Sequence, residues 1–397
     1  MSRFTFPIFF LVAVALLGGM HVYLWMRLVR DPALAEPWRR GMVVFLALAA
    51  VSVPAALVSA RFASGAAART AIALALGWLG TAFLLFSALL LADGVRLVAA
   101  AVEWIAAWTR PDPPADPGRR LFVARAVAGG AALAAGGATA WAVRRAVGEP
   151  AVREVPVRLD RLPPALSGFS IAQITDLHVG QTIRESDVRR VVELVNAARP
   201  DLVAITGDLV DAPVPALRHA TEHLARLRAR HGVVFVSGNH EYYSGAAAWL
   251  AEMRRCGIRV LHGERVRVGD EGPGGASLDV AGVPDWSVQG RDGSELARAL
   301  QGRDPDRSLV LLAHQPRGVG EAVRAGVELQ ISGHTHGGQI FPWTLVVGAV
   351  FPYYRGLYRH REGQREGQVY VSTGAGYWGP PLRLGAPPEI AKVVLTT

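Results

Sequence analysis

Polar clusters follow apolar runs at intervals through the C-terminal half of this 397-residue chain. Each cluster carries carboxylate, amide or imidazole groups: Asp176-Leu177-His178, Gly207-Asp208, Gly238-Asn239-His240-Glu241, Ala313-His314 and Gly333-His334-Thr335-His336. Oxygen and imidazole ligands of this kind suit Mn, Fe, Zn or Co. Two such ions can stabilise both the attacking and the leaving oxygen of a phosphoryl displacement, and they can supply hydroxide near neutral pH. The pattern therefore predicts a hydrolytic site with two divalent metal ions, built where successive strands end.

Apolar, β-rich runs alternate with helical patterns in the same half of the chain. We expect strands at 169–175, 201–206, 232–237, 308–313 and 328–332, with later ones at 277–283, 367–372 and 389–396. Helical patterns occupy 185–198, 214–230, 243–256 and 317–325. This alternation is typical of an α/β domain with a largely buried sheet. Active sites in such folds gather beyond the carboxyl ends of the strands, where each cluster lies.

Spacing within the clusters indicates which side chains share an ion. Asp176 and His178 lie two residues apart at a strand end, so both side chains point the same way and can reach one ion. His334 and His336 repeat that spacing, and they can serve one ion each or the same ion. Asp208 follows a glycine that lets the backbone turn sharply, and we expect its carboxylate to bridge both ions.

Taken in order, these motifs resemble those of calcineurin-like metallophosphoesterases over about residues 169–396. Three further stretches resemble the membrane-associated branch of that family, which includes transmembrane and bacterial members: 174–178, 333–339, and 370–376 with the later 388–390. The resemblance implies a four-layer α/β/β/α sandwich. It implies a first metal bound by Asp176, His178, Asp208 and His336, and a second bound by Asp208, Asn239, His314 and His334. It also implies that His240 is an acid near the leaving group rather than a ligand.

One departure from the superfamily pattern narrows the substrate class. The segment Asp208-Leu209-Val210-Asp211 is followed by Ala212. The protein serine/threonine phosphatases of this superfamily carry an arginine there for the phosphate. Its absence argues against a phosphoprotein phosphatase.

Long apolar runs dominate the first 145 residues. Residues 6–26, 41–60, 70–92 and 121–143 are each long enough to span a bilayer, which needs about 20 apolar residues. Residues 94–108 are apolar but carry Arg96 and Glu103, so we expect an interfacial or buried helix there, with a fifth span as the alternative. The predicted organisation is a transmembrane region at 1–145, a linker at 146–168 and a phosphoesterase domain at 169–397.

Arginines indicate the orientation of these spans. Arginines follow the first span and precede the fourth, and both loops are cytoplasmic under the positive-inside tendency. The segment 118–123, with Arg119 and Arg120 before an Ala-rich run, resembles a twin-arginine export signal, although two juxtamembrane arginines have the same appearance. Both features predict an extracytoplasmic catalytic domain in a multi-pass cell-membrane protein, and Arg144 and Arg145 oppose that orientation.

The remaining features have less specific interpretations. The formal charge is +9, but the arginines are scattered, so we expect no nucleic-acid partner. His219 and His223 lie four residues apart on a predicted helix, and we expect a solvated face. Residues 341–354 are apolar and aromatic, which favours a folded cap over the site and leaves a segment in the lipid interface as the alternative.

Two classes of function remain open from the sequence. The first is a membrane-anchored metallophosphoesterase acting on a phosphoester or diphosphate, for which relatives suggest a phospholipid or glycolipid diphosphate. The second is a metal-binding sensor or transporter-associated regulatory domain without turnover. The spans hold few ionisable groups, mainly His21 and Arg125, and transport pathways usually need more. The first class is therefore favoured.

Overall fold

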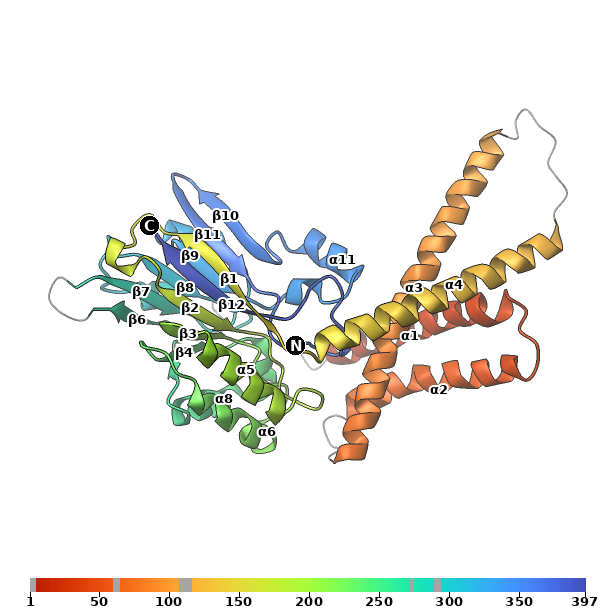
Figure 1. Ribbon diagram of the computed structural model, residues 1–397, viewed down its shortest axis with the longest axis horizontal. Coiled ribbons are helices and arrows are strands. Elements are labelled where there is room, and N and C mark those ends of the chain that lie inside the picture. Colours follow the sequence, from red (N-terminus) through yellow and green to blue (C-terminus); the bar gives the residue numbers. More distant parts are fainter. Residues whose placement is uncertain (1–4, 60–64, 107–115, 271–274, 289–293) are drawn as a thin grey trace. The chain divides into compact units, whose positions relative to one another are not determined.

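The computed structural model describes residues 5–59, 65–106, 116–270, 275–288 and 294–397. The chain forms two compact units. One consists of Met1–Arg144 with Gly379–Leu382, and the other of Arg145–Trp378 with Arg383–Thr397. The first unit contains the long N-terminal helices, and the second contains two sheets and shorter helices (Figure 1).

Four long helices form the N-terminal region. They are α1 (Thr5–Trp25), which continues as the π-helix η1 (Met26–Arg30), α2 (Trp38–Ser59), α3 (Ala66–Ala106) and α4 (Pro117–Ala146). Each is long and apolar enough to cross a membrane. The expected N-terminal region of about four long apolar helices is therefore present, and these helices support a membrane protein.

The expectation for residues 94–108 needs correction. Residues 94–106 do not form a separate interfacial or buried helix. They are the last part of α3, which is a single helix of 41 residues. Residues 107 and 108 lie outside the described part of the chain. A helix of this length measures about 60 Å, whereas the hydrocarbon core of a bilayer is about 30 Å thick. Arg96 and Glu103 can therefore belong to a membrane-crossing helix while lying beyond its apolar span.

Two six-stranded sheets form the second unit. The first has the order β1-β12-β2-β3-β4-β5 and the second β10-β11-β9-β8-β7-β6. The first sheet comprises β1 (Ala151–Arg158), β12 (Glu389–Thr396), β2 (Ser170–Ile174), β3 (Leu202–Thr206), β4 (Val233–Val236) and β5 (Arg259–Val260). The second comprises β10 (Gly356–Glu362), β11 (Arg365–Val371), β9 (Leu329–Ser332), β8 (Leu309–Leu312), β7 (Ser277–Gly282) and β6 (Glu264–Gly269). Strands β2 to β5 are mutually parallel, as are β7, β8, β9 and β11.

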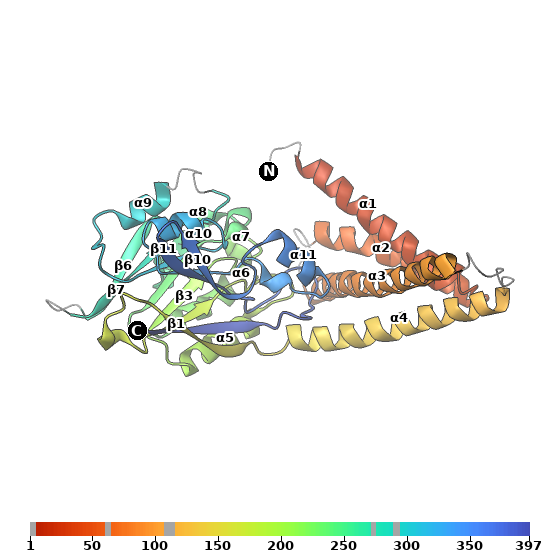
Figure 2. The same cartoon turned by 90° about the horizontal axis from the view of Figure 1, so that it is seen from above.

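The central strands are short and wholly buried because each sheet is covered on both faces. Leu202 and Ala204 of β3 share one hydrophobic core with Val310 and Leu312 of β8, so this core lies between the sheets. Helices α5 (Glu185–Ala197), α6 (Val214–Thr221) and α8 (Ala246–Arg255) contribute to a core with the outer face of the first sheet. Helices α9 (Ser294–Leu300) and α10 (Val319–Arg324) do so for the second sheet. This is the expected four-layer α/β/β/α sandwich (Figure 1 and Figure 2).

Residues 146–168, expected as a linker, contain regular secondary structure. Strand β1 runs over Ala151–Arg158 and pairs in parallel with β12, and η3 (Pro164–Leu166) is a turn of 3-10 helix. Val155 and Val157 are buried between exposed neighbours. The segment that joins α4 to the sandwich therefore shortens to residues 147–150.

Residues 341–354 also differ from the favoured expectation of a folded cap. They contain α11 (Trp343–Val350), of which only Thr344 is buried. Phe341, Trp343, Leu345, Val346 and Val350 are all exposed. Helix α11 packs on the 3-10 turn η5 (His336–Gly338).

Candidate metal centre

Five strand ends supply the predicted ligands. Asp176 and His178 follow β2, Asp208 follows β3, and Asn239 follows β4 in the first sheet. In the second sheet, His314 follows β8, and the pair His334 and His336 follows β9. Backbone hydrogen bonds connect neighbouring loops, for example from Gly333 N–H to His314 O at 2.8 Å. The sandwich therefore brings the carboxyl ends of both sheets to one edge, as ligand sites in α/β folds require.

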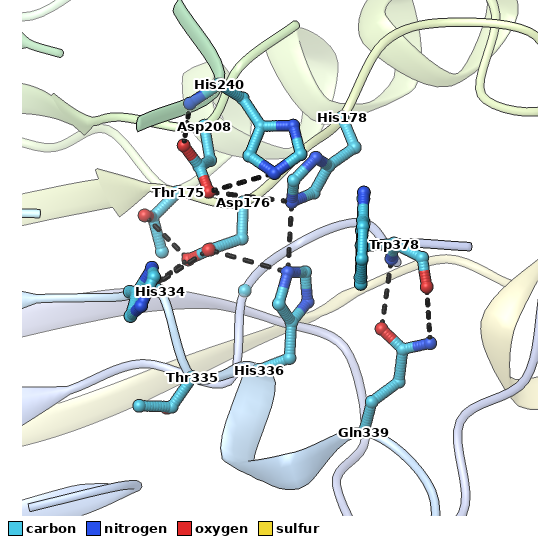
Figure 3. Close-up of polar contacts among 12 residues, drawn as sticks. Thr175, Asp176, His178, Asp208, His240, His334, Thr335, His336, Gln339 and Trp378 are labelled. Atoms are coloured by element: carbon cyan, nitrogen blue, oxygen red, sulfur yellow. Dashed lines mark hydrogen bonds and ion pairs between the residues drawn. The ribbon is translucent and has the colours of Figure 1, made fainter. Parts of the chain in front are cut away.

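Three groups of possible metal ligands overlap at this edge. They are Asp176-His178-His336, His178-Asp208-His240 and Asp208-His314-His334, and within each group one ligand atom per residue lies within 4.8 Å of the others. His178 Nε2 is 3.0 Å from His336 Nε2 (Figure 3). His314 Nε2 is 3.1 Å from Asp208 Oδ2. Residues separated by more than 150 positions in the sequence thus converge.

Asp208 lies where the groups meet. Its Oδ2 is 3.9 Å from His178 Nε2 on one side and 3.1 Å from His314 Nε2 on the other. Its Oδ1 accepts a hydrogen bond from His240 N–H at 2.9 Å, which fixes the carboxylate. This position suits the bridging role expected for Asp208.

The backbone at the site is strained. Asp176, His178, Asp208, His334 and His336 all have φ between 50° and 71°. Residues other than glycine rarely adopt this left-handed region, and each instance costs on the order of 1 kcal/mol or more. Only eight described residues other than glycine have positive φ, so the strain concentrates at the predicted ligands.

Two glycines leave room for the carboxylates. A Cβ on Gly333 would lie 2.2 Å from Asp176 Oδ2, and one on Gly238 would lie 2.3 Å from Asp208 Oδ1. No side chain fits at such distances. These two glycines therefore allow the backbone to pack directly against the carboxylates of Asp176 and Asp208.

The donor set fits metal ions. Asn239 Oδ1 and His334 Nδ1 are among the buried polar atoms of the described residues that make no hydrogen bond, although such atoms are normally paired. His314 Nδ1 lies 2.8 Å from the carbonyl oxygen of Thr206, and in the neutral ring donation to that oxygen leaves a lone pair on Nε2. His178 Nδ1 lies 2.8 Å from Asp211 Oδ1, with the same consequence. Orientation of histidine ligands by such partners is usual at metal sites.

His240 lies at the rim of this cluster. Its Nδ1 is 2.7 Å from Asp211 Oδ1, and its Nε2 is 4.0 Å from Asp208 Oδ2. Its ring is 4.5 Å, centroid to centroid, from that of His178 and 5.8 Å from that of Trp378. The structure thus brings His240 within reach of a group bound at the site, beside the ligands.

Three residues near the site were missed in the sequence. Asp211 contacts both His178 and His240, and its position three residues after Asp208 was the available signal. Glu241 accepts hydrogen bonds from the backbone N–H groups of Asp208, Leu209 and Gly238.

The third, Arg383, is fully buried. It donates to the carbonyl oxygens of Gly376 and His336, and its Nη2 lies 3.1 Å from His336 Nδ1. No sequence signal marks Arg383, because it lies 47 positions from its partner.

His223 also departs from expectation. It is buried, and its Nε2 lies 2.9 Å from Glu185 Oε1 on α5. It is therefore not part of a solvated helix face. His223 and His219 are both absent from the three ligand groups found among the described residues.

Burial and charge set the protonation of the metal-free site. Burial disfavours the charged form of His178, but Asp211, Asp208 and Asp176 outweigh it and raise the pKa of His178 to about 9. Burial would also lower the pKa of His314, but the nearby charges, mainly that of Asp208, outweigh it and raise this pKa to about 10. Burial, reinforced by His314, lowers the pKa of His334 to about 4. Without metal, protons on His178 and His314 thus balance the carboxylates.

Two acidic groups at the site have pKa values that are shifted in opposite directions. Burial would raise the pKa of Asp208, but His314, His178 and His240 hold it well below its usual range. Burial and the charge of Asp208 raise the pKa of Glu241 to about 7.

Comparisons with known proteins show the family to which the chain belongs. The calcineurin-like phosphoesterase family profile matches residues 169–338. The transmembrane protein with metallophosphoesterase domain of Bos taurus is 39% identical over 256 residues, covering 62% of this chain and 57% of that protein. A metallophosphoesterase of Helicobacter pylori strain J99 is 38% identical over 249 residues, covering 62% of this chain and 64% of that protein. The chain thus spans less than two thirds of these two relatives.

A metallophosphoesterase of Aquifex aeolicus is 33% identical over 253 residues, covering 62% of this chain and 91% of that protein. Among solved structures, a 5'-nucleotidase precursor of Thermus thermophilus has a TM-score of 0.35 at 15% identity, covering 57% of this chain and 54% of that one. A dimetal phosphatase of Danio rerio has a TM-score of 0.31 at 12% identity, covering 52% of this chain and 88% of that one. From the family profile and its sequence relatives, the chain belongs to the calcineurin-like phosphoesterase family of hydrolases.

Proposed function

We propose that this protein is a membrane-anchored phosphohydrolase that uses two divalent metal ions. In this proposal the first ion is held by Asp176, His178, Asp208 and His336, and the second by Asp208, Asn239, His314 and His334. Ions held there would supply hydroxide near neutral pH and would neutralise charge on the phosphoryl oxygens.

One observation carries the proposal. Asn239 Oδ1 and His334 Nδ1 are buried without a hydrogen-bond partner, and His314 Nε2 lies 3.1 Å from Asp208 Oδ2. All of these residues belong to the proposed ligand set of the second ion. Leaving such atoms unsatisfied costs roughly 1–3 kcal/mol each. A bound cation satisfies them, and Asp208 contributes the negative charge that binding needs.

We assign His240 to the leaving group. Asp211 lies 2.7 Å from its Nδ1, which directs Nε2 away from that carboxylate. From there Nε2 can give a proton to the leaving oxygen, which is general acid catalysis. Asp211 acts through His240 and His178, so it is a positioning residue.

A lipid-linked phosphoester or diphosphate is the substrate class that we favour. Arg317 is exposed, and its guanidinium lies 5.8 Å from the centroid of the Phe351 ring, which itself is 6.1 Å from the ring of His334. A cation beside the second metal position suits a second phosphate. The four apolar helices hold the domain near lipids.

The direct test is hydrolysis and metal content of the purified full chain. Phosphomonoesters, phosphodiesters and lipid diphosphates would be compared with Mn, Fe, Zn and Co. Asp208→Asn should lose at least one ion and nearly all hydrolysis. The control is Asp160→Asn, since the Asp160 side chain is 86% exposed. Two tightly held ions in Asp208→Asn would refute the bridge.

A second variant separates binding from chemistry. His240→Ala should retain both ions and lower turnover by about 10²–10⁴-fold, the usual scale for acid–base catalysis. Loss of metal along with activity would make His240 a ligand. A parent protein that binds two ions but hydrolyses no substrate of any class would favour the regulatory alternative.

A further inference from the structure

Helix α11 has an apolar surface that its own domain does not cover. Phe341, Trp343, Leu345, Val346 and Val350 have exposed fractions of 49%, 51%, 64%, 44% and 67%. A helix that is apolar on every side is normally buried, and a contiguous exposed apolar surface marks a contact with a protein or membrane. Figure 1 and Figure 2 both place α11 outside the layered sheets.

The composition around α11 favours lipid as the covering partner. Residues 337–354 contain no Asp, Glu, Lys or Arg, and Trp343, Tyr353 and Tyr354 accompany the aliphatic residues. Trp and Tyr are enriched at the level of lipid headgroups. An apolar helix with aromatic neighbours therefore has the composition of a segment that lies in the membrane interface.

Two arginines flank the C-terminal end of this surface. The Arg317 guanidinium lies 5.8 Å from the centroid of the Phe351 ring, and that of Arg355 lies 5.2 Å from the centroid of the Tyr354 ring. Cations beside an apolar helix add attraction to anionic headgroups. A hydrophobic protein partner would gain nothing from this arrangement unless it carried matching acids.

The chain itself keeps a bilayer within reach. Helix α4 is apolar enough to cross a membrane and ends at Ala146, and β1 begins at Ala151. Residues 147–150 extend at most about 3.6 Å each, so the tether spans less than about 20 Å. The sandwich cannot move far from the lipid surface.

We infer that α11, together with Phe341, forms a membrane-docking surface that inserts into the lipid headgroup region. This docking does not depend on hydrolysis. Thr335 Oγ1 donates to Tyr354 O at 2.6 Å, which connects the end of the α11 segment to the turn that carries His334 and His336. If the proposed function holds, docking therefore places the candidate metal centre at the level of phospholipid phosphates.

Spin labels on the full chain in vesicles test this inference. Leu345→Cys and Val350→Cys would each be made with Cys256→Ala, because Cys256 is the only native cysteine. Val288→Cys is the matched control, since Val288 is an exposed aliphatic residue at 47% outside α11. Accessibility to oxygen, which partitions into lipid, would be compared with accessibility to a water-soluble chromium(III) complex on both sides of the vesicle.

Labels at 345 and 350 should favour oxygen by several-fold over the label at 288. The preference should strengthen when phosphatidylglycerol is added to phosphatidylcholine vesicles. The inference would be overturned if the label at 345 had the same relative accessibility to oxygen and to the chromium(III) complex as the label at 288, because the surface would then lie in water. Exclusion of both reagents would also overturn it, in favour of a second copy of the chain. Neither readout needs turnover, so a failed hydrolysis assay leaves this test intact.

Discussion

The candidate ligands are held in conformations that an isolated peptide would avoid. Left-handed φ values at Asp176, His178 and Asp208 place the side chains toward one point before any ion is present. The cost is offset by the buried strands on either side and by hydrogen bonds such as Asp176 N–H to Gly207 O at 3.1 Å. This geometry is a property of the sandwich and not of the local sequence.

Asp211 gives a prediction at the scale of one residue. Asp211→Asn keeps the size of the side chain but removes the charge that orients His178 and His240. Activity or metal affinity should fall by about 10–100-fold, as for other residues that orient metal ligands. Asp160→Asn, at an exposed position, should leave both unchanged. Unaltered activity in Asp211→Asn would show that its two contacts are incidental.

Metal uptake should depend on pH. In the metal-free site the pKa of His178 is raised to about 9 and that of His314 to about 10, so both carry protons at neutral pH. Binding must displace these protons, so affinity should rise about tenfold per pH unit for each proton released, and level off above those pKa values. Titration of chelator-treated protein with Mn²⁺ between about pH 6.5 and 8.5 measures this. His178→Asn should release one proton fewer, and affinity independent of pH would contradict the argument.

Among the elements, sequence reasoning located those with strong local signals. The run 169–175 contains β2 at Ser170–Ile174, and 389–396 coincides with β12. It missed β1, β5, β6 and β10. The side chains of β1 and β10 are largely exposed, which removes the apolar signal of a buried strand. Strand β1 pairs with a segment more than 200 residues away, and no local periodicity encodes such a partner.

The candidate ligands could be located in the sequence for the same reason as the central strands. Each follows a buried apolar run directly, so the strand end marks it. Arg383 and Asp211 support the site from loops, where only the folded distance reveals their role. The apolar pattern of α11 was recognised, but whether protein or solvent covered it depended on packing.

The turn after β9 gives a prediction at the scale of an element. Gly333→Ala would place a Cβ 2.2 Å from Asp176 Oδ2, which forces the turn and the carboxylate apart. The variant should lose metal and most activity. Gly302→Ala is the control, because Gly302 has a φ of 67° but no atom within 4 Å of its added Cβ; it should cost about 1 kcal/mol and retain metal. Normal metal content in Gly333→Ala would contradict the prediction, because it would show that the turn can shift to accommodate the Cβ without loss of the site.

At the scale of the whole molecule, the side of the membrane is the main prediction. Arg119 and Arg120 at the start of α4, together with the other loop arginines, predict that the domain lies outside the cytoplasm. Protease added to intact spheroplasts should remove residues 146–397 and leave the helical region. Cleavage only after lysis would place the domain inside, and a cytoplasmic nucleotide or lipid precursor would then be the better substrate.

The short connection at residues 147–150 has a kinetic consequence. A domain on such a tether samples a layer next to the bilayer and not the bulk volume. For a substrate that is itself embedded in that bilayer, encounters arise from lateral diffusion in two dimensions. The relevant concentration is then the mole fraction of substrate among lipids, so diluting it with inert lipid should slow the reaction, whereas diluting the vesicles in buffer should not.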